Sequence, residues 1–216
     1  VTLLVDVSAS MRYGSGDLNK YEYAATVAAS LAYLLLRQHD GAACIAFDEG
    51  IRARTPLRST QNHLAAIVKA LDANPPRDKT DAGAVLSEIA EASPRRGLMI
   101  VVSDLLGDVG STLRGLRLLR QRGQDVIVLH VLEDDELDFP FDGPTRFEGL
   151  ELPETLNCNP RALREGYLAA LRQFLEALRH GGARDAVDYT LLRTSQPLDA
   201  ALAALLTRRL AAYRTR

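Results

Sequence analysis

Short apolar runs recur along the chain and predict strands. Most are rich in Val, Ile and Leu with little polar alternation, which is typical of strands covered on both faces. The runs are Val1–Val7, Ala42–Phe47, Ile51–Thr55, Leu98–Val102, Asp125–Leu132 and Val187–Leu192. The second and third of them flank Asp48-Glu49-Gly50, a Gly-containing sequence that predicts a hairpin turn.

Longer segments with a helical pattern separate these runs. They are Asn19–Gln38, Thr60–Leu71, Asp81–Ala92, Ser111–Arg122, Pro160–His180 and Pro197–Tyr213. The first of them, which Asn19 or Asp17 can cap, carries Ala and Leu nearly all the way round and is expected to be largely buried. Because strands alternate with helices, the chain is predicted to be an α/β protein with a doubly wound sheet.

The pattern changes between residues 133 and 157. This stretch is acidic and aromatic and is punctuated by Pro and Gly, which suits a hairpin-like insertion better than a helix. It could be a docking surface for a basic partner, or it could pack against a segment that precedes this chain. The 216 residues as a whole are expected to form a single domain.

Composition and charge narrow the classes of function. With 26 Lys and Arg against 28 Asp and Glu, the net charge of -2 favours neither nucleic acid nor anionic lipid as a partner. Cys44 and Cys158 are too few for a disulfide framework, which indicates a reducing, cytoplasmic location. The longest apolar stretch, Tyr23–Leu36, falls short of the roughly 20 residues that span a bilayer. Because the chain starts on Val1 inside a strand pattern, we expect that an upstream region of the full protein is missing.

Oxygen-bearing side chains follow two of the apolar runs. Asp6 closes the first run and Asp104 follows Leu98–Val102, so both acids are expected at the edge of the sheet where the winding direction reverses. Two carboxylates brought together repel each other, whereas a divalent cation between them balances their charge. Ser8 and Ser10 can aim their hydroxyls at the same point. These hard oxygen donors favour Mg²⁺, with Mn²⁺ able to substitute.

Asp6-x-Ser8-x-Ser10 resembles the DxSxS signature of the metal-ion-dependent adhesion site in von Willebrand factor A domains. The resemblance implies a mostly parallel, doubly wound sheet with helices on both faces and one antiparallel edge strand, which Ile51–Thr55 would supply. The site of that family also uses a Thr from a later loop and an Asp after the fourth strand. The implied metal ligands in this chain are Asp6, Ser8, Ser10, Thr80 and Asp104.

In von Willebrand factor A domains the serines bind the cation directly, and the aspartates act partly through water. The ion keeps an open coordination position for a carboxylate from a partner. By this resemblance the chain would be a binding module and not an enzyme.

Nearly the whole chain resembles the bacterial MoxR-associated family catalogued as domain of unknown function fifty-eight. The likeness rests on the successive segments DVSASMRYGSG, QHDGAACIAF, KTDAG, VVSDLL, HVLEDDELDFPF and DYTLLRTSQPLD. The resemblance implies an N-terminal segment before this region. It also implies a MoxR-type AAA+ ATPase, or the client of that ATPase, as a partner in protein maturation or assembly.

Other interpretations of the same residues stay open. Ser8 and Ser10 could simply cap a turn, Thr80 could cap the helix over Asp81–Ala92, and the site could be a metal-free scaffold. A Mg²⁺-dependent phosphoryl-transfer enzyme also places acids at the tips of a doubly wound sheet. Such enzymes usually carry a second Asp two residues after the nucleophile, where this chain has Ser8. The four His residues, His130 among them, show no ligand spacing and are expected to have structural or surface roles.

Overall fold

A six-stranded sheet forms the centre of the computed structural model, which describes residues 1–93, 96–151, 154–204 and 207. The strand order is β3-β2-β1-β4-β5-β8. The strands are β1 (Thr2–Asp6), β2 (Ala43–Phe47), β3 (Ile51–Arg54), β4 (Leu98–Ser103), β5 (Asp125–Leu132) and β8 (Asp188–Arg193). Neighbouring strands are parallel except β2 and β3, which are antiparallel. The predicted doubly wound, mostly parallel sheet with one antiparallel edge strand is confirmed.

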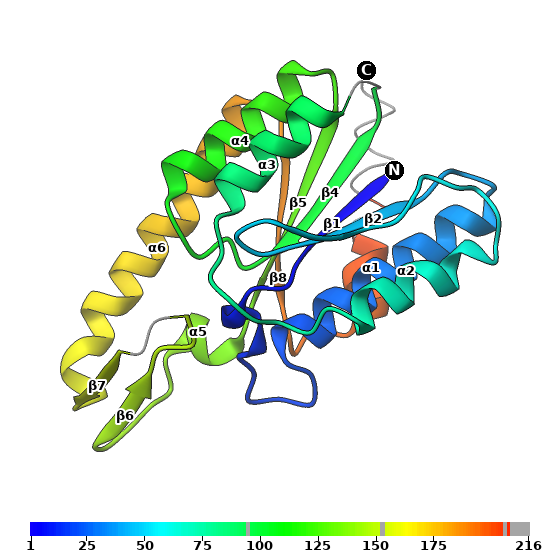
Figure 1. Ribbon diagram of the computed structural model, residues 1–216. Coiled ribbons are helices and arrows are strands. Elements are labelled where there is room, and N and C mark those ends of the chain that lie inside the picture. Colours follow the sequence, from blue (N-terminus) through cyan, green and yellow to red (C-terminus); the bar gives the residue numbers. More distant parts are fainter. Residues whose placement is uncertain (94–95, 152–153, 205–206, 208–216) are drawn as a thin grey trace.

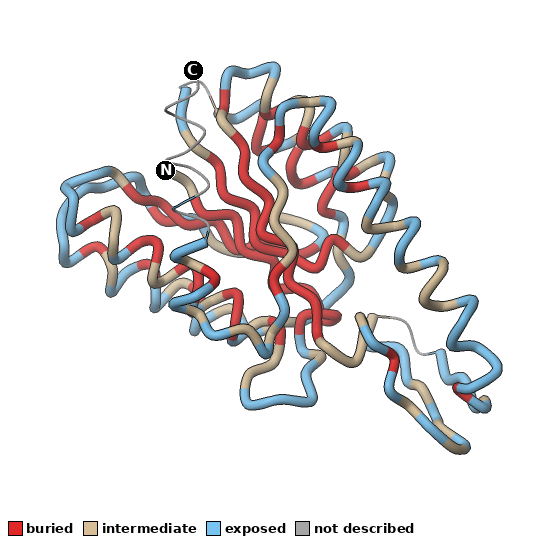
Figure 2. Tube along the Cα trace, turned by 180° about the vertical axis from the view of Figure 1, so that it is seen from behind, coloured by how far each residue is buried: buried red, intermediate tan, exposed pale blue. Residues whose placement is uncertain are grey.

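Helices cover both faces of this sheet (Figure 1). They are α1 (Lys20–Arg37), α2 (His63–Asp72), α3 (Ala82–Ala92), α4 (Val109–Gln121) and α6 (Pro160–Arg184). Helices α1 and α2 lie on one face, and α3, α4 and α6 lie on the other. Leu3 and Val5 of β1 pack toward α1, whereas Leu4 packs toward α3 and α4. The central strands are therefore buried on both faces, as Figure 2 shows, which explains their uninterrupted apolar runs.

The winding direction of the chain reverses between β1 and β4. The chain adds β2 and β3 on one side of β1, and then β4, β5 and β8 on the other side. Because Val5 pairs with Val102, Asp6 and Ser103 end adjacent parallel strands at the same edge of the sheet. In open α/β sheets this edge is where ligands bind.

Side-chain caps set the ends of the helices that border this edge. Asn19 and Glu22 form a capping box that starts α1 at the predicted place. Asp81 caps α3. Asp108 caps α4 by accepting the Ser111 backbone N–H, so this helix begins before the predicted Ser111.

One other predicted helix begins later in the structure, and another is described only in part. Helix α2 begins at His63 and not at Thr60, because the Thr60 carbonyl accepts the His63 N–H in a turn before the helix. Residues 198–204 and 207 are helical, and the rest of the predicted Pro197–Tyr213 helix lies outside the described residues. In the part of the chain that the structure describes, no helix is long and apolar enough to cross a membrane.

Residues 133–158 leave the sheet after β5 and form an excursion from it. The excursion contains the short helix α5 (Asp134–Asp138) and an antiparallel hairpin of β6 (Thr145–Glu148) and β7 (Thr155–Cys158). The hairpin agrees with the sequence pattern, but the start of the excursion is helical because Glu133 and Glu136 form a capping box. The hairpin extends away from the buried sheet (Figures 1 and 2).

An aromatic cluster ties this hairpin to α6. Phe139, which ends α5 with a φ of 43°, is only 6% exposed. Its ring centroid lies 4.6 Å from that of Tyr167 on α6 and 5.8 Å from that of Phe147 on β6. Phe141 completes the cluster at 5.2 Å from Phe147. The base of the hairpin is therefore packed and held in one place.

Candidate metal centre

Three loops meet at the edge of the sheet beyond β1 and β4. The first follows β1 and forms the 3-10 helix η1 (Ala9–Arg12). The second lies against it, with hydrogen bonds of 2.9 Å from Arg77 N to Val7 O and from Ala9 N to Asp78 O. The third follows β4. Together these loops carry all of the predicted ligands, which are Asp6, Ser8, Ser10, Thr80 and Asp104.

Asp6 is a fully buried carboxyl at the end of β1. Its Oδ1 accepts the Ser8 backbone N–H at 2.8 Å, and its Oδ2 accepts the Ser103 hydroxyl at 2.5 Å. Burial and the neighbouring Asp104 raise the pKa of Asp6 to about 7, although hydrogen bonds from Ser103 and Ser8 lower it. A nearby cation would relieve the cost of holding this carboxyl in its charged form.

Ser8 and Ser10 place two hydroxyls side by side. Both residues are buried, and their Oγ atoms lie 3.1 Å apart. Neighbouring ligands of an octahedral Mg²⁺, each bound at about 2.1 Å, stand roughly 3 Å apart. The two hydroxyls therefore have the spacing of one edge of such an octahedron.

Thr80 lies immediately before α3, but it does not cap this helix. The cap is Asp81, whose side chain accepts the Ala84 N–H at 3.0 Å, so the alternative role considered for Thr80 is wrong. Thr80 Oγ1 is buried, and within the described residues it has no hydrogen-bond partner. An unsatisfied buried polar group costs about 1–3 kcal/mol, which a bound ligand would offset.

Asp104 is held by a buried lysine. Lys20 Nζ donates to Asp104 Oδ2 at 2.8 Å and to Glu136 Oε1 at 2.7 Å, and the Lys20 side chain is 0% exposed. Burial lowers the pKa of Lys20, but the attraction of Asp104 and Glu136 outweighs burial and raises it above its ordinary value. Since Asp104 Oδ1 also accepts the Leu106 N–H at 3.2 Å, this carboxylate is fixed in position.

His130 on β5 holds the backbone of Asp104. Its Nε2 lies 2.7 Å from the Asp104 carbonyl oxygen, and its Nδ1 lies 2.6 Å from the Tyr189 hydroxyl. Burial lowers the pKa of His130 to about 4, so the ring is neutral at pH 7. A neutral ring donates from Nε2 and accepts from Tyr189, which is a structural role.

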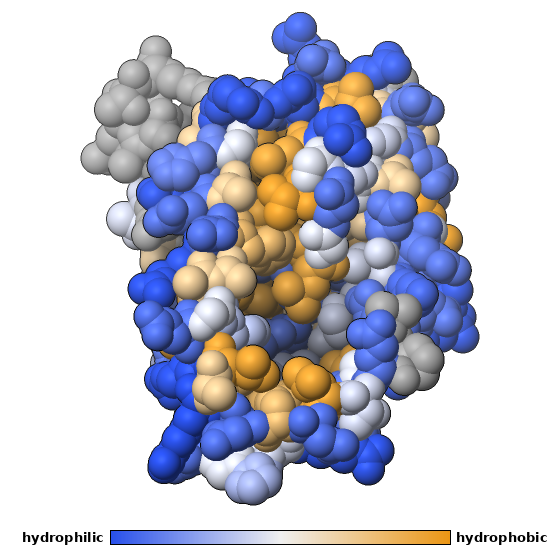
Figure 3. Space-filling model, turned by 90° about the vertical axis from the view of Figure 1, so that its left-hand side faces the viewer, coloured by the Kyte–Doolittle hydropathy of each residue, from blue (hydrophilic) through white to orange (hydrophobic). Residues whose placement is uncertain are grey.

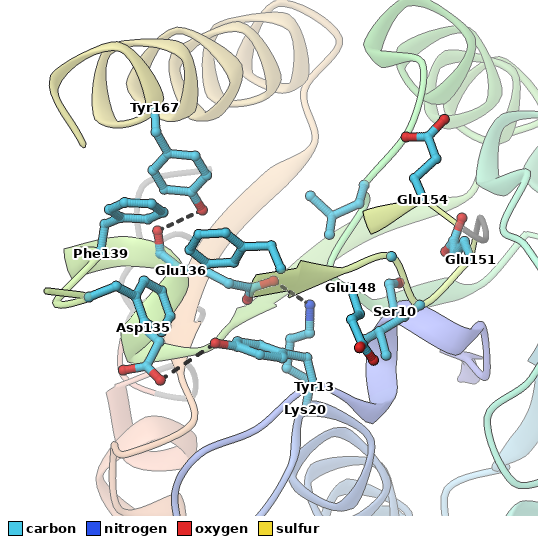
Figure 4. Close-up of a pocket in the computed structure, with 15 residues that line it drawn as sticks. Ser10, Tyr13, Lys20, Asp135, Glu136, Phe139, Glu148, Glu151, Glu154 and Tyr167 are labelled. Atoms are coloured by element: carbon cyan, nitrogen blue, oxygen red, sulfur yellow. Dashed lines mark hydrogen bonds and ion pairs between the residues drawn. The ribbon is translucent and has the colours of Figure 1, made fainter. Parts of the chain in front are cut away.

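A carboxyl group from the hairpin reaches the same place. Glu151, in the loop between β6 and β7, lies near Ser10 and the Thr80 backbone. Burial raises the pKa of Glu151, the neighbouring polar groups of Ser10 and Thr80 lower it, and Asp104 raises it further. Glu151 and Ser10 line one side of a pocket of ≈ 430 Å³, with Tyr167 across from them (Figure 4).

The donor set fits a small, hard cation. The part of the chain that the structure describes has no group of three or more His, Cys, Asp or Glu arranged to hold a metal, so a site here needs the Ser and Thr hydroxyls. Four carboxyls lie in this region and Lys20 pairs with two of them, Asp104 and Glu136, so a divalent cation would offset part of the remaining charge. These carboxyls belong to Asp6, Asp104, Glu136 and Glu151. A bound Mg²⁺ or Mn²⁺ would supply a Lewis-acidic point that accepts a further oxygen ligand.

Several residues that shape the site are missing from the sequence-based prediction. They are Lys20, Ser103, Glu136, His130 and Glu151. A signal for Lys20 does exist, because it falls on the same helical stripe as the buried residues Tyr23, Ala24 and Val27. The positions of the others depend on chain segments that meet only in the folded protein.

The strand order, the antiparallel edge strand and the loops at the β1–β4 switch define a von Willebrand factor A-like fold. Two solved structures are similar to it. One is an aerotolerance-related membrane protein from Bacteroides fragilis carrying multiple mutations to serine, which is 17% identical with a TM-score of 0.62 over 95% of this chain and 96% of that one. The other is the conserved hypothetical protein BatB from Bacteroides thetaiotaomicron, which is 16% identical with a TM-score of 0.59 over 96% of each chain. At these identities the likeness concerns the fold alone.

The chain belongs to the family described as protein of unknown function DUF58, whose model matches residues 1–176. The resemblance expected from the sequence is confirmed. Uncharacterized proteins of Mycobacterium tuberculosis and Mycobacterium bovis are 23% identical over 141 residues, or 64% of this chain. The matched part is 44% of their length, so the chain spans less than half of these relatives.

Proposed function

We propose that this domain is a non-enzymatic protein-interaction module that docks a partner's carboxylate on a bound Mg²⁺ or Mn²⁺ ion. The hydroxyls of Ser8, Ser10 and Thr80 would hold the ion directly, with Asp6 and Asp104 behind them. The observation that carries this proposal is the buried Thr80 hydroxyl, which has no hydrogen-bond partner among the described residues.

The chemistry of the donors favours docking of an acidic group. Neutral hydroxyls leave most of the charge of the ion uncompensated, whereas direct carboxylate ligands would neutralise it. Lys20 reduces the negative charge of Asp104 further. A carboxylate from a partner would therefore gain by joining the ion. Both oxygens of Asp6 are already hydrogen-bonded, which suits a supporting role better than that of a nucleophile.

From the resemblance of the sequence to the MoxR-associated family, we propose as partner a MoxR-type AAA+ ATPase, or the client of that ATPase in protein maturation or assembly. Such a partner consumes ATP, so the proposal places this segment in the cytoplasm. Neither nucleic acid nor a membrane surface is part of the proposed interaction, because the net charge of -2 provides no general attraction to them.

Replacing Thr80 with Val tests the ion site without disturbing the fold. The hydroxyl has no partner among the described residues, so its loss is expected to leave the ion-free protein at least as stable as the wild type. If Thr80 binds the ion, Thr80→Val weakens Mg²⁺ binding by roughly tenfold or more in isothermal titration. Thr26→Val makes the same change on the exposed face of α1 and is expected to bind like the wild type.

Two outcomes would contradict the proposed ion site. One is a wild-type protein that binds neither Mg²⁺ nor Mn²⁺, and the other is equal binding by wild type and Thr80→Val. The partner is tested separately with the purified MoxR-type ATPase of the same host. Binding that disappears both with chelator and in Thr80→Val supports docking through the ion, and binding that survives both argues against it.

A further inference from the structure

Residues 149–151, which follow β6, are held beside the site by the pairing of the hairpin. Strands β6 and β7 pair from Thr145 opposite Cys158 to Glu148 opposite Thr155, and Gly149 N donates to Glu154 O at 2.8 Å. The aromatic cluster fixes the base of this hairpin. On the side of the molecule shown in Figure 3, apolar side chains surround a hollow. Residues 149–151 line this pocket together with Ser10.

Glu151 differs from the other acidic groups of this hairpin. Glu148 pairs with Arg146 at 2.9 Å on the exposed surface, and Glu154 is exposed. Figure 4 shows the Glu154 carboxylate pointing away from Ser10. In contrast, Glu151 Oε1 is buried and has no hydrogen-bond partner within the described residues.

The surroundings of Glu151 suit a ligand of a metal ion. The carboxyl faces Ser10 and Thr80 and lies close enough to Asp104 for the two to repel each other. Among the described residues, no Lys or Arg pairs with Glu151, whereas Lys20 forms ion pairs with Asp104 and Glu136. Bringing an unpaired acid toward another buried acid is costly unless a cation joins them.

We propose that Glu151 is a ligand for the ion supplied by the chain itself, and that it occupies the coordination position that a partner's carboxylate would take. This inference rests on the proposed function. The hairpin then both strengthens ion binding and competes with the partner. A partner's carboxylate binds only in the fraction of molecules in which Glu151 has left the ion, so its apparent affinity is reduced by that fraction.

Glu151→Gln separates the two effects, because they have opposite signs. Loss of the carboxylate is expected to weaken Mg²⁺ binding by roughly tenfold in isothermal titration. The same variant, saturated with Mg²⁺, is expected to bind a blocked tripeptide with a single glutamate at least about tenfold more tightly than the wild type does. A substitution that merely loosened the structure would weaken both interactions.

Glu154→Gln is the matched control, because it removes the same charge from the same hairpin at an exposed position. It is expected to behave like the wild type in both titrations. Hydrogen exchange of residues 149–151 supplies a third measurement. Mg²⁺ is expected to slow exchange there in the wild type and in Glu154→Gln, and to have no effect on it in Glu151→Gln.

The results distinguish failure of this inference from failure of the ion site. The ion site stands if the wild type binds Mg²⁺ and Thr80→Val does not. If Glu151→Gln then binds Mg²⁺ and the tripeptide like the wild type, Glu151 is not a ligand, and only the further inference is overturned. If the wild type binds no ion, the proposed function fails first and this inference fails with it.

Discussion

At the scale of single residues, the least expected feature is a lysine buried between two acids. Lys20 opens α1 on the face that packs into the core, and its partners Asp104 and Glu136 lie on the loop after β4 and on α5. Burying an ammonium group is unfavourable unless its charge is matched and its donors are satisfied. One of these two acids, Asp104, is itself a predicted ligand of the ion.

Replacing Lys20 with Met is expected to destabilise the ion-free protein by about 3 kcal/mol, because it leaves two acids facing each other without their cation. Urea unfolding in the presence of chelator measures this. Lys69→Met, on the exposed face of α2, is the control and is expected to change the free energy of unfolding by less than about 0.5 kcal/mol. A similar, small effect of both substitutions would show that the buried ion pair contributes little.

At the scale of elements, the close approach of α3 and α4 sets the position of Thr80. Gly83 in the first turn of α3 lies against α4, and a Cβ built on it would come within 2.6 Å of Ser111 backbone carbon. Gly115 on α4 is equally close, because a Cβ there would lie 2.7 Å from Leu86 Cβ. The absence of side chains at these two positions lets α3 begin next to the β4 loop.

Gly83→Ala is therefore expected to destabilise the protein by about 1–3 kcal/mol and to weaken Mg²⁺ binding, because displacement of α3 carries Thr80 with it. Gly166→Ala on α6 is the matched control, since a Cβ there meets nothing within 4 Å. The better helix propensity of Ala is expected to stabilise the control by up to about 1 kcal/mol. Urea unfolding and isothermal titration measure the two effects, and destabilisation of both variants alike would refute the packing argument.

The sequence predicts most of the secondary-structure elements, but not all of the residues of the candidate site. Apolar runs predict the four central strands well, because a strand buried on both faces must be apolar throughout, whereas the edge strands β3 and β8 are only partly buried. The placement of Asp6 and Asp104 follows from the rule that parallel strands end at one edge. The start of the excursion at Glu133 was not predicted as a helix, because five residues are too few for periodicity to show. Nothing local to Glu151 reveals that its loop folds back by way of rings from α5 and α6.

At the scale of the whole molecule, the site couples the two layers of the fold. Lys20 belongs to the layer of α1, whereas Thr80 leads into α3 on the opposite face of the sheet. An ion held between them would bind the folded protein and not the unfolded chain, so it would stabilise the fold as a unit.

Mg²⁺ at about one hundred times its dissociation constant is expected to stabilise the protein by roughly 2.7 kcal/mol, which raises Tm by about 5–10 °C for a chain of this size. Differential scanning calorimetry with and without Mg²⁺ measures this. Thr80→Val is expected to show a Tm no lower than that of the wild type without the ion, and almost no shift with it. An equal shift in both proteins would place the bound ion elsewhere.

The position of the excursion has a consequence for diversification. It departs after β5 and returns at the start of α6, and its rings close on one another without entering the two cores between sheet and helices. The part of the excursion beyond Phe141 can thus change in length and composition while the scaffold stays the same, whereas Glu136 remains tied to Lys20. Exchanging residues 142–157 between paralogues would transfer the selectivity for a partner and leave the sheet and its covering helices unchanged.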